Sequence, residues 1–595
     1  MKQIKLVLFL LVLAGCTAND SVSQQTVQAF LDDYSSKFQK LYYASAEAEW
    51  GANTYLVEGD QKTAAAARAA NKALAAFTGS KDNIEKAKFF LKTSVELTPI
   101  RSKQLKNILY AAANNPQTVP QLVKERIEAE AKQISKLYGF SFKLNGKKVS
   151  TGKLDAILHK EVDVNKRLAA WEASKEVVTT LKNGLESLRS LRNQTVEALG
   201  YDDYFSCQVS DYEMTASEML EMNLRFLEEL RPLYRELHTY SRYELAKKYG
   251  LRNVPEYLPA HWLPNRWGQD WTSMINVERP DLNRALEDYS AEWIVRQSEE
   301  FYKSIGFDAL PESFYEKSDM YPLPQGSKYK KSSHASAWHM NLDDDIRCLM
   351  SVRSTAEYYE TVHHEFGHVY YYIAYTHPGI PLLLRKGANR AFHEGVGNLL
   401  GFAAMQKPFL VGRGLISEDC KTDELKIMLK EALDFIVFMP WASGVMTEFE
   451  YELYSNGLSK DQYNSKWWEL KKKHQGIVAP SYRGEKYCDA ASKTHINTDA
   501  AQYYDYALSY VLLFQLHDHI SRKILQTDPW ATNYYGNREV GSFLHSILSK
   551  GASKDWQKLL MDTLGEDISA KAMLSYFEPL IEYLQEQNIG RKHTL

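Results

Sequence analysis

The chain has 595 residues, of which 44% are hydrophobic and 25% charged, so it can build a large core and is too apolar to be disordered. Its 72 lysine and arginine residues nearly balance 75 aspartate and glutamate residues, which gives a formal net charge of −3 at pH 7. Without an overall positive field, the chain is a poor candidate for binding a nucleic acid by its backbone. Low proline (18) and glycine (30) counts favour long helices over a turn-rich sheet.

The N-terminal residues predict a targeting segment. A charged head precedes an apolar run at residues 6–13 that is too short to span a bilayer, so residues 1–15 are predicted to be a signal peptide. The small-small-Cys ending at Cys16 resembles the lipobox of bacterial lipoproteins, and we expect a lipidated N-terminus and tether over residues 16–24. The alternative is an ordinary signal peptide with a chance cysteine. Thr17, rather than aspartate, after Cys16 favours the outer membrane, facing the periplasm.

The first part of the mature chain is predicted to be helical. Residues 26–115 contain an alanine-rich stretch of strong helix formers. No proline occurs between Pro120 and Pro232, which lets helices run unbroken. Residues 140–149 alternate around an Asn-Gly pair and predict one β-hairpin.

The second part is predicted to be loop-rich at first and then helical again. Seven prolines fall between residues 255 and 324, where loops can carry function. Residues 333–338 and 348–352 are typical of short strands. Apolar residues recur at spacings of three and four over 355–375, and a second helix is predicted from about Phe392 to Ala403. These patterns favour a mainly α protein with a minor β-sheet, built as one large unit.

A metal-binding motif lies on the first of these two helices. Residues 363–368 read HHEFGH and contain the HExxH pattern as His364, Glu365 and His368. Residues four apart share a helix face, so both imidazoles can reach one ion while Glu365 accepts a proton from a zinc-bound water. We expect the neighbouring His363 to pack against the protein or to face solvent.

A catalytic zinc site needs a third protein ligand. Glu394 follows a loop and lies near the start of the second helix, where a helix–loop–helix would return it to the HExxH face. His393 is the competing candidate. The sequence therefore predicts one Zn²⁺ per chain, held by two histidines and a glutamate, with a fourth position open to water.

The motif HHEFGH followed by GANRAFHEGVGN resembles the angiotensin-converting enzyme family of zinc peptidyl-dipeptidases, which are gluzincin metallopeptidases. Other family segments occur in the family's order: WxQxW at 267–271, HASAW at 334–338, KxH at 493–495, YxxY at 503–506 and FQLH at 514–517. The resemblance implies a two-lobed helical body around a deep, narrow cleft, with zinc at its floor and N-terminal helices over its mouth. It also implies one peptidyl-dipeptidase domain over residues 25–595, which releases dipeptides from peptides with a free C-terminus.

The resemblance also implies residue roles. Glu365 would act as general base and later as general acid. Donors to the tetrahedral intermediate would be Tyr506 and His495. Groups that hold the substrate as an added strand would be His334, Ala335 and Ala337. Groups that bind the C-terminal carboxylate would be Gln269, Lys493 and Tyr503.

Four positions depart from the family. Asn398 replaces an aspartate that orients a zinc-ligating histidine, so we expect weaker zinc binding or lower activity. Asp505 stands where animal relatives have a chloride-binding arginine, and we therefore do not expect chloride activation through this position. Ser333 replaces a disulfide cysteine. His339 replaces an aspartate after HASAW, which leaves the side-pocket preference open.

Two other functions remain open from the sequence. The first is a related helical zinc oligopeptidase or a carboxypeptidase that removes single residues. The second is a peptide-binding lipoprotein whose altered site turns over weakly, although the intact Glu365 argues against it.

Overall fold

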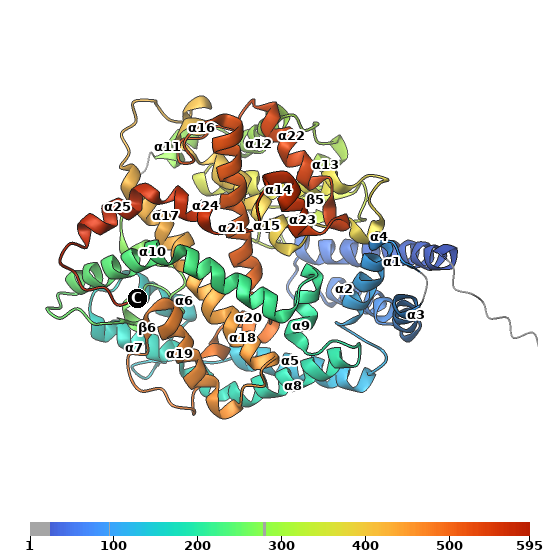
Figure 1. Ribbon diagram of the computed structural model, residues 1–595, viewed down its shortest axis with the longest axis horizontal. Coiled ribbons are helices and arrows are strands. Elements are labelled where there is room, and N and C mark those ends of the chain that lie inside the picture. Colours follow the sequence, from blue (N-terminus) through green and yellow to red (C-terminus); the bar gives the residue numbers. More distant parts are fainter. Residues whose placement is uncertain (1–23, 94–95, 278–280) are drawn as a thin grey trace, which may run out of the picture.

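The computed structural model describes residues 24–93, 96–277 and 281–595, and nearly all of its regular structure is helical (Figure 1). The predicted signal peptide and Cys16 lie outside the described residues. Within the described ranges, every helix is too short or too polar to cross a membrane.

The helices are α1 (Gln24–Thr54), α2 (Gln61–Thr78), α3 (Lys81–Lys92), α4 (Pro99–Ala112), α5 (Pro120–Tyr138), α6 (Thr151–Lys160), α7 (Val164–Ser174), α8 (Lys182–Glu197), α9 (Tyr204–Val209), α10 (Ala216–Lys248), α11 (Leu282–Leu286), α12 (Ala291–Ile305), α13 (Glu312–Lys317), α14 (Ala356–Tyr375), α15 (Arg390–Ala404), α16 (Lys407–Gly412), α17 (Glu424–Met439), α18 (Thr447–Tyr454), α19 (Tyr463–Gln475), α20 (Thr494–Thr498), α21 (Tyr504–His519), α22 (Arg538–Leu548), α23 (Trp556–Leu564), α24 (Lys571–Tyr576) and α25 (Glu578–Gln587). The strands are β1 (Lys143–Leu144), β2 (Lys147–Lys148), β3 (Leu258–Pro259), β4 (Ser336–His339), β5 (Ile346–Leu349) and β6 (Ile477–Val478). The predicted mainly α class with minor sheets is confirmed, whereas the deep cleft between two lobes stays a prediction.

The N-terminal helices form a small core of their own, and α1 also packs against the β4–β5 hairpin. Buried residues of α1, α3 and α4 make up this core, among them Leu31 and Phe90. Towards its C-terminal end, α1 places Trp50 edge-on against Trp338 of β4, with ring centroids 5.6 Å apart. Glu47 on the same helix forms an ion pair with Arg347 of β5. The N-terminal helices are therefore joined to the strand pair by both apolar and charged contacts.

The hairpin predicted at 140–149 is present as β1 and β2, which pair antiparallel. Asn145 and Gly146 connect them with φ angles of 51° and 76°. Asparagine and glycine tolerate this left-handed conformation, which matches the twist of a two-residue hairpin turn. This prediction is confirmed.

The largest apolar core extends from Leu137 to Leu584 and includes the fully buried tryptophans Trp171, Trp271, Trp441 and Trp556. In Figure 1, α21 runs through the centre, with α14 and α15 to its right, α22 towards the top, and α5, α8 and α19 below. The four cysteines outside the targeting segment, Cys207, Cys348, Cys420 and Cys488, are free thiols.

Strands β4 and β5 pair antiparallel, with Ala337 opposite Cys348. The second strand was predicted at 348–352, and this position is wrong by a few residues. The backbone amides of Met350 and Val352 donate to the carbonyls of Asp319 and Met320, so this stretch pairs with another segment instead of with β4. β4 has one partner among the described strands, which is β5.

Candidate metal centre and substrate site

Two capped helices position the predicted ligands. α14 begins after Thr355, whose side chain accepts a hydrogen bond from the backbone amide of Tyr358. α15 begins after Asn389, whose side chain accepts from the amide of Phe392. The bounds of both helices agree with the sequence prediction to within about two residues.

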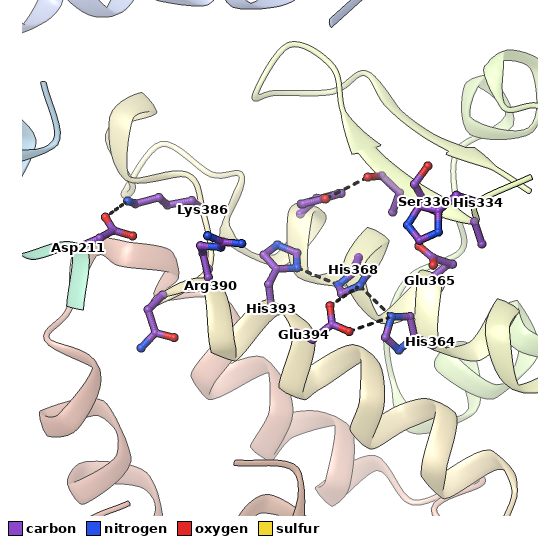
Figure 2. A pocket seen from close by; sticks show the side chains of 15 residues that line it. Asp211, His334, Ser336, His364, Glu365, His368, Lys386, Arg390, His393 and Glu394 are labelled. Carbon is purple, nitrogen blue, oxygen red and sulfur yellow. Dashed lines mark hydrogen bonds and ion pairs between the residues drawn. The ribbon is translucent and has the colours of Figure 1, made fainter. Parts of the chain in front are cut away.

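The three predicted ligands converge where these helices cross (Figure 2). The Nε2 atoms of His364 and His368 lie 3.1 Å apart. The two carboxylate oxygens of Glu394 lie 3.9 Å from these nitrogens, one oxygen facing each imidazole. Across the described ranges, this trio is the one group of three or more potential metal ligands whose atoms all lie within 4.8 Å of one another.

The ligand set fits zinc. Zn–N and Zn–O bonds of about 2.0–2.1 Å at tetrahedral angles place ligand atoms roughly 3.3 Å apart, close to the spacing of the two imidazoles. The slightly larger distances to the Glu394 carboxylate need only a small side-chain adjustment. One carboxylate and two neutral imidazoles leave room for a fourth ligand, as in catalytic zinc sites.

Glycines allow the two helices to approach this closely. A Cβ atom added to Gly367 of α14 would lie 2.9 Å from the Cα atom of Gly397 on α15. A Cβ atom on Gly397 would lie 2.9 Å from Cε1 of His368 and 3.0 Å from Cε1 of His364. Gly397 therefore borders both imidazoles directly.

Further side chains orient the imidazoles. Nδ1 of His368 lies 3.0 Å from Nδ1 of His393. If Nε2 of His368 binds a metal, its Nδ1 carries the proton and donates it to His393. The alternative that His393 is the third ligand is therefore not supported, because this histidine faces a ligand instead of joining the cluster. The Asn398 side chain forms a hydrogen bond with His364. The buried His363 forms a hydrogen bond with the Tyr359 carbonyl through Nδ1 and has a packing role.

Glu365 is buried beside the ligands, with only 6% of its surface exposed. Burial, and secondly the charge of Glu394, raise the pKa of Glu365 to about 8, while the backbone amide of Ala337 donates to its carboxylate. The carbonyl of Ala337 accepts a hydrogen bond from the Tyr372 hydroxyl at 3.2 Å. β4 therefore holds the candidate general base, and both backbone groups of Ala337 have partners in the structure.

A pocket of about 450 Å³ opens over the ligands. Figure 2 shows His334, Ser336 and Glu365 on one side of the ligands, and Lys386 and Arg390 on the other. His334 and Ala335, predicted to hold the substrate, both line this pocket.

The residues predicted to bind a carboxylate also lie together. The Lys493 ammonium donates to Oε1 of Gln269 at 2.7 Å. It lies 4.7 Å from the ring centroid of Trp267 and 5.3 Å from that of Tyr503. Burial, and secondly Arg266, lower the pKa of Lys493 to about 7. A buried ammonium with one neutral acceptor is suited to bind a substrate carboxylate, which would restore its charge.

Two tyrosines connect this cluster to His495. The rings of Tyr503 and Tyr506 lie 5.1 Å apart. The Tyr506 hydroxyl lies 3.4 Å from Nε2 of His495, and burial, with a smaller contribution from nearby carboxylates that include Glu394, raises the pKa of Tyr506. The five residues predicted for carboxylate binding and intermediate stabilisation thus form one continuous group.

An ion pair that sequence reasoning missed joins α15 to α21. Nε of Arg390 lies 3.1 Å from the carboxylate of Asp505, which also accepts a hydrogen bond from the Tyr212 hydroxyl. Arg390 and Asp505 are widely separated in sequence, and no local pattern pairs them. Asp505 was singled out only as a departure from the family.

The crossed helices, with two histidines of an HExxH motif and a glutamate on the next helix, define the class of helical proteins with a gluzincin-type zinc site. A family model described as Angiotensin-converting enzyme (Peptidase_M2) matches residues 21–595, and the chain belongs to this family. It is 29% identical over 592 residues to angiotensin-converting enzyme of Mus musculus, covering 96% of this chain and 44% of the relative. It is 32% identical over 439 residues to the Bos taurus enzyme, covering 71% and 33% respectively. The chain spans less than half the length of these relatives.

Proposed function

We propose that this protein is a zinc-dependent peptidyl-dipeptidase that hydrolyses peptides with a free C-terminus and releases C-terminal dipeptides. The observation that carries the proposal is that one fold holds the convergent trio His364, His368 and Glu394 together with a buried cluster in which Lys493 can bind a carboxylate. An enzyme that binds the C-terminal carboxylate at a fixed position cuts at a fixed number of residues from it. Family membership supports the same activity.

The residues have separate tasks in this reaction. Zinc, when bound, would act as the Lewis acid that polarises the scissile carbonyl and acidifies water. Glu365 takes a proton from the attacking water and delivers it to the leaving amine as the C–N bond breaks. The Tyr506 hydroxyl and the His495 imidazole donate to the oxygen that gains negative charge. Lys493 and Gln269 hold the C-terminal carboxylate, which aligns the second-last peptide bond with Glu365.

Product analysis tests this function. The purified protein, with and without a chelator, is incubated with a blocked tripeptide and with a longer peptide, and the products are identified by mass spectrometry. We expect successive dipeptides that disappear with the chelator and with Glu365→Gln. Release of single residues would support a carboxypeptidase, and stoichiometric zinc without hydrolysis would support a peptide-binding protein.

We also propose that chloride does not activate turnover through the position of Asp505. The Asp505 carboxylate repels anions and has Arg390 and Tyr212 as partners within the protein. Rates should agree in chloride and in acetate at equal ionic strength. A steep rise with chloride concentration would refute this proposal.

The proposed location is the bacterial cell envelope, anchored by a lipid on Cys16 and facing the periplasm from the outer membrane. This proposal depends on the sequence of the first 24 residues alone. Labelling of cells with radioactive palmitate, followed by membrane fractionation, should detect the lipid in the outer membrane and lose it in Cys16→Ser. An unlabelled, soluble wild-type protein would refute it.

A further inference from the structure

Arg390 lies at the start of α15, one helical turn before the candidate ligand Glu394, and it forms ion pairs outside its own helix. Its Nε atom lies 3.1 Å from the carboxylate of Asp505, and its Nη2 atom lies 3.6 Å from the carboxylate of Asp499. The Asp505 side chain is only 9% exposed, so the first of these pairs is largely removed from solvent. The guanidinium therefore joins α15 to the end of α20 and to the start of α21.

Each of the two aspartates adjoins a residue predicted to donate to the tetrahedral intermediate. Asp505 directly precedes Tyr506 in the first turn of α21. Asp499 ends α20, and its backbone amide donates to the carbonyl of His495 at 3.0 Å. A shift of α15 relative to these aspartates would therefore change the distance between Glu394 and the two donors, Tyr506 and His495.

A tyrosine hydroxyl adds a second connection between the same elements. The Tyr212 hydroxyl donates to the carboxylate of Asp505 and accepts a hydrogen bond from the backbone amide of Ala391 at 3.3 Å. Ala391 follows Arg390 in α15, so both connections are made within one helical turn. Tyr212 and Asp505 are both buried, and buried polar groups with specific partners favour a single arrangement of the elements that carry them. The start of α15 is thus held against the start of α21 by an ion pair and two hydrogen bonds.

Arg390 keeps its charge in this environment. Burial would lower the pKa of Arg390, but the charges of Asp505 and Asp499 outweigh this effect and raise it overall. A planar guanidinium presents donors in several directions and can serve two carboxylates, whereas a lysine ammonium is a point charge on a flexible stem. An uncharged residue at position 390 would leave the buried Asp505 carboxylate without this cation, which is unfavourable.

We propose that Arg390 is a positioning residue, which sets the distance between the zinc ligand on α15 and the two donors to the tetrahedral intermediate. The inference rests on the proposed function, because it takes Tyr506 and His495 to act on that intermediate. Donors of this kind bind the transition state more strongly than the substrate, so their displacement lowers kcat more than it changes KM. Loss of Arg390 should therefore slow turnover while substrate binding stays nearly unchanged.

Steady-state kinetics on a blocked tripeptide, with rates normalised to bound zinc, test this inference. Arg390→Met should lower kcat about 10- to 100-fold and change KM less than about threefold. Arg390→Lys keeps the charge without the planar group, and should lower kcat by about threefold to tenfold. The matched control Arg522→Met removes an ion pair with Asp518 of α21 and should keep the wild-type kcat. A kcat within twofold of wild type in both Arg390 variants, or an effect confined to KM, would overturn the inference.

A binding measurement separates this inference from the proposed function. A phosphinic tripeptide analogue, whose tetrahedral phosphinate resembles the intermediate, and the free dipeptide Phe-Leu are titrated calorimetrically into zinc-loaded protein. Arg390→Met should weaken binding of the phosphinate at least tenfold and binding of the dipeptide less than threefold, because only the tetrahedral group contacts the two donors. That result supports the positioning role even if no peptide is hydrolysed, in which case only the proposed activity fails. Equal weakening of both ligands, or of neither, overturns the inference even when dipeptides are released.

Discussion

Replacing Gly397 by alanine should weaken zinc binding without unfolding the protein. The added Cβ atom would lie 2.9 Å from Cε1 of His368, and 3.0 Å and 3.1 Å from Cε1 and Nδ1 of His364. These contacts are shorter than ordinary van der Waals separations by a few tenths of an ångström, so the imidazoles must move. Overpacking of this kind costs about 1–3 kcal/mol. Alanine offsets about 1 kcal/mol of this through its higher helix propensity.

The displaced atoms belong to the predicted ligands, so the loss should appear mainly in zinc affinity. We expect a decrease of about 10- to 100-fold, similar to the effect of removing a group that orients a ligand. Competition against a fluorescent chelator measures the affinity, and thermal unfolding of the metal-free protein measures stability. The matched control is Gly401→Ala, one turn further along α15, whose closest contact would be Cβ of His364 at 3.3 Å. If the zinc affinity of Gly397→Ala is within twofold of the wild-type affinity, then the close approach of the two helices does not control the geometry of the zinc ligands.

Three further substitutions test other parts of the site. His393→Phe removes the nitrogen that accepts the hydrogen bond from Nδ1 of His368, and should weaken zinc binding about tenfold in chelator competition. An unchanged zinc affinity would show that His393 does not orient His368. Lys493→Met should raise KM for peptides with a free C-terminus roughly 30-fold, about 2 kcal/mol, at unchanged zinc content. A KM equal to that of the wild type would show that Lys493 does not bind the substrate. Arg390→Met should destabilise the protein by about 1 kcal/mol in urea unfolding, with a larger loss at pH 8 than at pH 5. Burial raises the pKa of Asp505 from 3.8 to about 7, although Arg390 opposes this shift. The free energy of unfolding therefore falls as the pH rises between these two values. Without Arg390, the buried ionised carboxylate is less favourable still, so the loss of stability is larger at pH 8. Equal losses at the two pH values would show that the residues are not coupled.

The sequence predicted those features that depend on local spacing. The HExxH spacing and the apolar positions at intervals of three and four together predicted α14, because helix geometry relates residues only a few positions apart. The turn at Asn145 and Gly146 was predictable for the same reason. The grouping of Lys493 with Gln269 came from the family resemblance, since no pattern within the chain relates residues so far apart.

What the sequence could not supply were contacts between distant segments. His393 was considered as a ligand because its residue type suits zinc, and only the crossing of α14 and α15 turns it toward His368. Asp434 lines a pocket formed by side chains of four helices, and the sequence around Asp434 does not indicate this pocket. The error in the position of the second strand also came from a contact between distant segments, because the amides of Met350 and Val352 donate to carbonyls of residues 319 and 320.

Through its contacts with the β4–β5 hairpin, the first helix, α1, supports the strand that holds Glu365. Trp50 and Glu47 support Trp338 and Arg347, and the same strand pair carries the Ala337 amide that holds Glu365. A chain cut back past residue 54 would expose Trp338 and leave Arg347 without Glu47. N-terminal truncation would therefore disturb Glu365, the candidate general base, through the strand to which its carboxylate is hydrogen-bonded.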